Sequence, residues 1–320
     1  MRKMIFFLMF SVYLYAQNIG YQNYSLFSKN RDKNINAMLF YPSIEKEDFV
    51  LGKHKLFMPE NVSLGGKIKK GKYPLLLLSH GGLRSSLNQI NWLAKNLAKE
   101  GFIVLLTRSN LDKKFVLYEP WFRANDIYIA FEKLKNDKKF KNSIDFENIN
   151  SVGFLLGASS LILSSSAKIN YTSYKNQCSN SQSLDCAWYE KSSINLDSFD
   201  KKIIKDIQVS LPIKKAVLFD TEHSKIFDKN SLKSSKSDFY FINLSNMKAL
   251  DNSHFNDKYK YEKIKNTNAF SSFSLCTNKG ELILKGTEDN KNICFDNNSK
   301  KKVIHEIILN RILEYFKEKS

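Results

Sequence analysis

Apolar and polar positions fall into blocks that predict strands and helices in alternation. The run YPLLLLS at 73–79 is apolar almost throughout, as in a strand buried on both faces. Apolar residues then recur at 87, 90, 93, 94 and 97, a helical period, and Gly101 stands just beyond as a C-cap. A second apolar strand is expected at 102–107.

The alternation continues to the end of the chain. Further strands are expected at 36–42, 150–156, 215–219 and 239–244, and further helices at 124–134, 158–167 and 303–316. Strands that alternate with helices predict an α/β fold, with a mostly parallel sheet and helices on both faces. Between 170 and 211 the sequence turns polar, which indicates an insertion or lid.

The first sixteen residues have the pattern of a secretory signal. Arg2 and Lys3 precede the apolar run 4–15, and Ala16 provides a small residue for cleavage. We therefore expect a signal peptide at 1–16 and a single domain at 17–320. The mature protein is predicted to be periplasmic or secreted.

The four cysteines fit an oxidising compartment. Cys178 lies close to Cys186 in the sequence, and Cys276 lies close to Cys294. Four cysteines allow three pairings, and pairing between sequence neighbours is the simplest of them. A zinc site would require C-x-x-C or a histidine at tight spacing, and neither is present. We expect two disulfides, no metal site and no cofactor.

The net charge of +18 bears on the kind of partner that the protein binds and says little about its fold. A basic surface favours anionic envelope polymers or a membrane surface. No regular stripe of basic and aromatic residues supports a nucleic-acid groove, so nucleic acid is not expected. The partner is predicted to be a small molecule or a protein of unknown identity, and a solvated lysine-rich surface is the simpler interpretation of the charge.

The stretch INSVGFLLGASSLIL at 149–163 has the form of a catalytic turn. In the G-x-S-x-G motif a nucleophilic serine stands on a strained strand-to-helix turn between two glycines. Here Gly153 and Gly157 flank Leu155, so leucine stands where the serine belongs. The segment LSHGG at 78–82 would supply the matching oxyanion-type loop.

In order and spacing, several segments resemble the secreted dienelactone-hydrolase-like and platelet-activating-factor acetylhydrolase-like α/β-hydrolases. They are FSKNRDKNINAMLFYP, LLLLSHGG with LAKNLAKEGFIVLL, FRANDIYIAFEKL, IDFENINSVGF, and NIC with VIHEIILNRILEYF. The resemblance covers most of the mature chain and implies the α/β-hydrolase fold with a disulfide-containing insertion. It also implies an oxyanion-type binding loop at His80, Gly81 and Gly82, completed by Leu156.

The resemblance further implies that the catalytic triad is degenerate. In the family the nucleophile follows the lead-in aspartate, here Asp145, by ten positions, which is Leu155. Ala269 stands where the triad histidine belongs, just before Cys276. The acid is expected around 245–247, where no carboxylate occurs.

Other residues offer a weaker route to activity. Ser159 lies in a shifted frame of the turn, and His223 or His254 could act as its base, although both histidines stand in polar segments that favour surface positions. His54 is interpreted in the same way, and His305 as a structural residue of the last helix. Asp220 and Glu222 form a possible carboxylate pair, for which a solvated loop is the simpler interpretation.

The leading hypothesis is an exported pseudoenzyme of the α/β-hydrolase fold that acts by binding. The first alternative is an active esterase or lipid acyl-hydrolase with a non-standard site. The second is an envelope-associated structural protein held by its basic surface.

Overall fold

The computed structural model describes residues 17–83, 86–108, 111–179, 183–207, 209–285, 293–294 and 297–318. The predicted signal peptide lies outside the described residues. None of the described helices is long and apolar enough to cross a membrane.

Six neighbouring strands run parallel through the middle of the sheet. They are β5 (Tyr73–Ser79), β6 (Ile103–Arg108), β7 (Ile144–Phe154), β8 (Ile213–Phe219), β9 (Asp238–Asn243) and β10 (Lys260–Lys263). Their order is β10-β9-β8-β7-β5-β6. Helices cover both faces of this part of the sheet, which explains the nearly unbroken apolar run of β5.

The amino-terminal strands extend the sheet beyond β6 and make it mixed. β2 (Lys33–Ser43) pairs antiparallel with β6, and β1 (Asn18–Ser28) pairs antiparallel with β2 along its whole length. β4 (Glu60–Leu64) then joins β1, and β3 (Phe49–Leu51) joins β4. The predicted α/β fold is confirmed: the central strands of the sheet are parallel, as expected, and antiparallel pairs join the amino-terminal strands.

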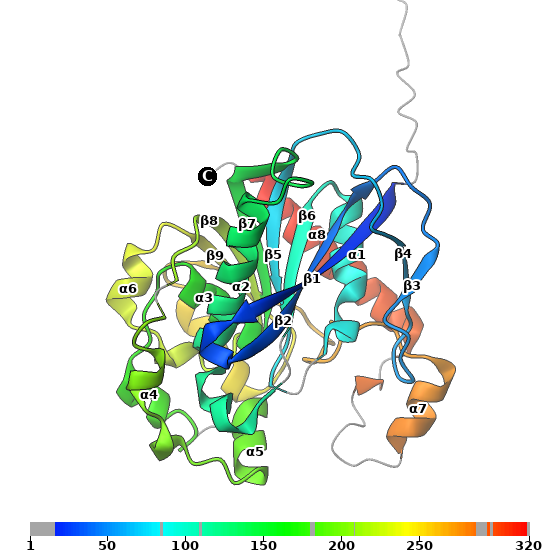
Figure 1. Cartoon of the computed structure of the whole chain (residues 1–320). Helices are drawn as coiled ribbons and strands as arrows, with labels where there is room; N and C mark the ends of the chain where they lie inside the picture. Colours follow the sequence, from blue (N-terminus) through cyan, green and yellow to red (C-terminus); the bar gives the residue numbers. More distant parts are fainter. Residues whose placement is uncertain are drawn as a thin grey trace, which may run out of the picture.

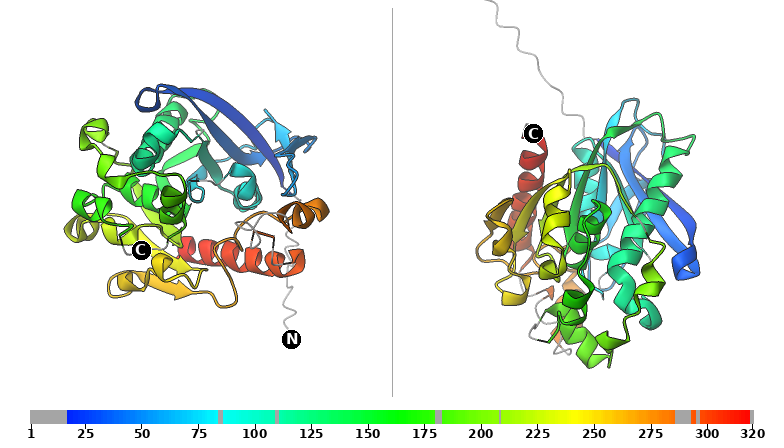
Figure 2. Two further views of the ribbon diagram at one scale, coloured as in Figure 1. Left: turned by 90° about the horizontal axis from the view of Figure 1, so that it is seen from below. Right: turned by 90° about the vertical axis from the view of Figure 1, so that its left-hand side faces the viewer.

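Helices α1 (Asn91–Lys99) and α8 (Asn298–Lys317) pack on one face of the sheet, and α2 (Glu119–Lys135) and α3 (Leu156–Ser164) on the other (Figures 1 and 2). Alternate residues of β5 separate the two cores. Leu76 and Leu78 pack with α1 and α8, whereas Leu75 and Leu77 pack with α2 and α3. The period of two along a strand produces this division.

Several predicted boundaries differ from the observed ones. α2 begins at Glu119 rather than near 124, because Pro120 is tolerated in the first helical turn, where its missing N–H costs nothing. β7 begins at Ile144 rather than near 150. The helix expected from the 87–97 pattern starts only at Asn91, after a short 3-10 turn at Leu87–Gln89.

The polar segment after α3 contains α4 (Tyr171–Lys175) and α5 (Leu184–Lys191). In Figure 1 both lie away from the sheet, toward the same end as α7 (Asn278–Lys285), and α6 (Lys229–Ser234) follows β8. The two predicted disulfides are confirmed. Their Cα–Cα separations are 5.4 Å for Cys178–Cys186 and 6.0 Å for Cys276–Cys294.

A buried ionic network joins the β1–β2 hairpin to α2. Arg31 donates to Glu119 at 2.6 Å and to Asp126 at 2.8 Å, and its side chain is 1% exposed. Burial opposes ionisation of Glu119, but Arg31 and Arg123 together hold its pKa below the ordinary value. Burial raises the pKa of Asp126 to about 6, with Arg31 opposing the change.

Replacing Arg31 should therefore be costly. Arg31→Met would leave two carboxyl groups buried without their shared cation, and we expect it to lower the free energy of unfolding by about 3–5 kcal/mol. Arg311, which pairs with Glu262 and has a side chain 38% exposed, provides the matched control. Arg311→Met should cost less than about 1 kcal/mol in urea denaturation. Equal losses in the two variants would contradict the structural role assigned to the network.

Candidate functional site

Leu155 occupies a sharp strand-to-helix turn between β7 and α3. Its backbone has φ 51° and ψ −123°, a conformation that is strained for a residue with a side chain. Backbone hydrogen bonds hold it there. The Leu155 N–H donates to the carbonyl of Phe219, and the Leu155 carbonyl accepts from the N–H groups of Ala158 and Glu222. The turn therefore has the strained backbone that is expected at a nucleophile position, with leucine on it.

The two flanking glycines are required by close backbone contacts. A Cβ on Gly157 would lie 2.6 Å from the carbonyl oxygens of Ser79 and His80, and a Cβ on Gly153 would lie 2.6 Å from the Cα of Ala158. These contacts press the start of α3 against the carboxyl end of β5. The two glycines therefore allow the close packing that shapes the turn.

The oxyanion-type loop follows β5 and is fixed by one arginine. Arg123 donates to the carbonyl oxygens of His80, Gly81 and Gly82 at 2.9, 2.7 and 3.1 Å. Burial lowers the pKa of His80 well below its usual value, with Arg123 adding to the effect, so its ring is neutral. His80 is thus part of a packed turn, and Leu156 begins α3 beside it.

The side chain of Leu155 is buried in a small apolar cluster. Leu155, Leu250 and Ala269 form its centre, and Leu184 and Met247 pack against them. The cluster brings together Leu155 at the turn, Ala269 at the position expected for a histidine, and the loop after β9, where the acid was expected. Next to it, between His80, Phe154 and Phe273, there is a cavity of about 10 Å³, which is too small for a substrate.

The weaker candidates lie elsewhere. Ser159 is fully buried in the first turn of α3, and its hydroxyl donates to the carbonyl oxygen of Glu222. His254 is exposed on a short 3-10 helix after β9. The ring of His305 is buried and stacks on Trp92 with centroids 3.6 Å apart.

His223, Asp220 and Glu222 are buried, and their predicted surface positions were wrong. Their exposed fractions are 6%, 2% and 0%. Asp220 accepts hydrogen bonds from Asn243, Leu244 and Ser245 and so joins the ends of β8 and β9. The polar groups of this segment form hydrogen bonds with one another and with the neighbouring backbone. In the sequence, such buried polar residues look the same as residues exposed to solvent.

Asp185 of α5 completes a buried cluster with Glu222 and His223. One ligand atom from each of the three residues lies within 4.8 Å of the other two, and His223 Nε2 is 3.9 Å from Asp185 Oδ2. Hydrogen bonds hold the group in place: the Asp185 N–H donates to Glu222 at 2.9 Å, and Asp185 Oδ1 accepts from the Leu83 N–H at 3.0 Å. The cluster therefore connects α5 with the oxyanion-type loop and with the segment after β8.

Sequence reasoning missed this cluster because Asp185 is far from the other two residues in the chain. Glu222 and His223 are adjacent, but an isolated Glu-His pair is a weak signal.

Burial of the cluster changes the protonation of its side chains. Burial and the nearby Asp185 carboxylate raise the pKa of Glu222 to about 8, and burial lowers the pKa of His223 to about 3. At neutral pH the imidazole is uncharged and Glu222 is largely protonated.

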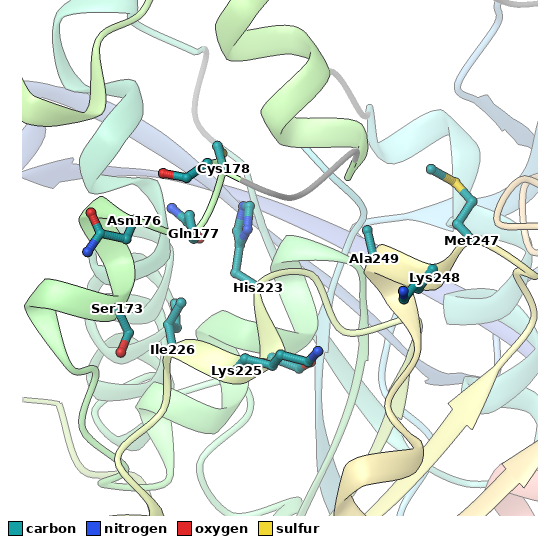
Figure 3. Close-up of a pocket in the computed structure, with 12 residues that line it drawn as sticks. Ser173, Asn176, Gln177, Cys178, His223, Lys225, Ile226, Met247, Lys248 and Ala249 are labelled. Carbon is teal, nitrogen blue, oxygen red and sulfur yellow. The ribbon is translucent and has the colours of Figure 1, made fainter.

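A larger cavity of about 840 Å³ opens beside the cluster (Figure 3). His223 lines it between the segment that follows α4 and the loop after β9. The other polar lining groups include Ser173, Asn176 and Gln177, and Lys225 and Lys248 are exposed at its edge. Its volume is in the range of small-molecule sites.

Comparison with known proteins supports the fold and no more than the fold. No family model and no curated protein matches the sequence. Among solved structures, a ferulic acid esterase from Streptomyces cinnamoneus matches with a TM-score of 0.56 and 11% identity. The match covers 91% of this chain and 88% of the esterase. The chain has a hydrolase-like α/β fold.

The pKa of Glu222 predicts how stability depends on pH. Since the folded state favours the protonated carboxyl, its stabilising effect is complete below about pH 4.5 and is lost as the pH rises toward 8. Glu222→Gln cannot ionise. The free energy of unfolding of the wild type relative to Glu222→Gln should therefore fall by roughly 1–3 kcal/mol between pH 5 and pH 8 in metal-free buffer.

Urea denaturation of both proteins at matched pH values measures this difference. Asp185, Asp220 and the hydrogen bond from Ser183 act on Glu222, and the nearby groups His223 and Tyr189 are also present in both proteins, so the titrations of these groups largely cancel. Parallel stability curves for the two proteins would show that Glu222 does not titrate as described.

Proposed function

We propose that this protein is an exported, non-catalytic member of the hydrolase-like α/β scaffolds that acts by binding a ligand. The observation that carries the proposal is the apolar cluster at the strand-to-helix turn. Leucine and alanine supply no nucleophile and no base, and the side chain of Leu155 packs with Leu250 and Ala269 at the turn where an esterase would display its serine.

The surrounding residues do not compensate for these losses. The hydroxyl of Ser159 donates to the carbonyl of Glu222, so it is bound to backbone rather than to a histidine. The imidazole of His223 lies 3.9 Å from the carboxylate of Asp185. An active esterase that uses Ser159 is the second candidate, favoured by the strained turn and the esterase-like neighbour.

The ligand is proposed to be a small polar molecule. The cavity beside His223 has a suitable volume and polar lining groups, and Lys225 and Lys248 at its edge favour a negative charge on the ligand. Export is supported by the two disulfides, which persist in oxidising compartments. The mature chain is thus proposed to act in the periplasm or outside the cell.

Ester turnover tests the proposal. Purified mature protein should hydrolyse p-nitrophenyl acetate and butyrate no faster than buffer, and a fluorophosphonate that reacts with activated serines should leave it unlabelled. Leu155→Ser or Ala269→His alone should change neither result, because triad residues act as a unit. The double variant should gain at most weak activity, since Met247 and Leu250 lie on the loop that would have to supply the acid.

Labelling of the wild type would separate the two candidates. If the protein is labelled and turns over esters, and Ser159→Ala abolishes both while Leu155→Ala abolishes neither, the second candidate is correct. Thermal denaturation confirms that each variant is folded, because Leu155→Ser also places a hydroxyl in an apolar cluster.

A further inference from the structure

Buried polar atoms without a hydrogen-bond partner gather around Glu222 and His223. In the described part of the chain they include Glu222 Oε2, His223 Nε2 and Thr221 Oγ1. A buried polar atom without a partner is costly, and native structures contain few of them. Their concentration in one place calls for a common physical explanation.

The chemistry of the cluster identifies the missing partner as a cation. Glu222 and Asp185 offer carboxylate oxygens, and His223 offers an imidazole nitrogen, all from atoms within 4.8 Å of one another. No lysine or arginine of the described residues forms an ion pair with Glu222. Two ionised carboxylates carry a charge of −2, which one divalent ion would neutralise.

We propose that Asp185, Glu222 and His223 bind one divalent transition metal ion of the zinc or manganese class. The mixed oxygen and nitrogen ligands favour this class, because imidazole suits transition metals and carboxylates suit harder ions. Two ligands of a tetrahedral zinc ion lie about 3.3–3.6 Å apart. The observed separation of 3.9 Å between His223 Nε2 and Asp185 Oδ2 therefore needs only a small side-chain movement.

The proposed site lies against the 840 Å³ cavity, which His223 lines (Figure 3). The three ligand atoms are themselves buried, so an ion would enter when the side chain of His223 moves, and three protein ligands would leave a coordination position for water or for another ligand. The second oxygens of the carboxylates are already oriented, since Asp185 Oδ1 accepts from the Leu83 N–H and Glu222 Oε1 accepts from the Asp185 N–H.

Metal binding would fasten the disulfide-bearing insertion to the scaffold. Asp185 belongs to α5, whereas Glu222 and His223 follow β8, so one ion would connect two segments that are distant in sequence. The inference goes beyond the proposed binding function and does not rest on it, because the three side chains are present whether or not the protein hydrolyses esters.

Calorimetric titration of untagged mature protein tests the site. The protein is stripped with EDTA, dialysed under non-reducing conditions so that both disulfides persist, and titrated separately with Zn²⁺ and Mn²⁺ at pH 7 and pH 8.5. We expect one equivalent of at least one of these ions to bind, with the melting temperature rising by about 3–6 °C at 100-fold excess over Kd.

The proton balance gives a second readout. Because a metal ion binds ionised carboxylates and neutral imidazole, binding should release protons and affinity should rise with pH. The acidic neighbours Asp185 and Asp220, the ring of His223 and the hydroxyl of Tyr189 face the carboxyl of Glu222. Titrations in buffers of different ionisation enthalpy measure the released protons.

Single substitutions locate the ion. Glu222→Gln and His223→Gln should each weaken binding at least about tenfold, and Glu222→Gln should reduce the proton release. His254→Gln removes an exposed histidine elsewhere and should leave binding unchanged. Circular dichroism shows whether each variant is folded. If one of the two cluster variants does not fold, metal binding to the other variant tests the site. Binding of neither ion to the wild type, or binding unchanged in the folded cluster variants, would overturn the proposal.

Discussion

The backbone turn at Leu155 is the constraint on which the functional end of this protein depends. A residue with positive φ costs about 1–3 kcal/mol and persists only where its surroundings determine it. Here the surroundings are β8, through the carbonyl of Phe219, and the contact of Gly157 with the carbonyls of Ser79 and His80. The same turn thereby aligns the carboxyl ends of β5, β7 and β8.

This alignment brings together the loops that follow β5, β7 and β8. The oxyanion-type loop follows β5, and Arg123 holds three of its carbonyl groups. Arg123 also donates to Glu119, which accepts from Arg31 of the amino-terminal hairpin. A network of charged side chains therefore runs from the β1–β2 hairpin to the oxyanion-type loop. In such a network each charge is stable because its partner is present, so the geometry of the loop depends on residues far from it.

Two environments of opposite character lie next to each other at this end of the sheet. The space above Leu155 is filled by Leu250, Ala269 and their neighbours, whereas Glu222, whose N–H donates to the carbonyl of Leu155, belongs to a buried polar cluster. The apolar cluster offers neither a nucleophile nor a base. The polar cluster retains ionisable groups with shifted pKa values, and such groups concentrate at functional sites. The binding chemistry of the protein is therefore expected on the side of His223 and α5.

Sequence alone determined the elements whose pattern is local. The apolar run of β5, the helical periods of α1 and α8 and the glycines around Leu155 each follow from residues a few positions apart, and the two disulfides join cysteines 8 and 18 positions apart. The β1 strand was not predicted, because its alternation is clear only once β2 pairs along it.

Tertiary structure alone decided which polar residues are buried. Asp185 meets Glu222 and His223 only after the insertion folds over the carboxyl ends of the strands, and burial, which sets their pKa values, is a property of that packing rather than of residue type.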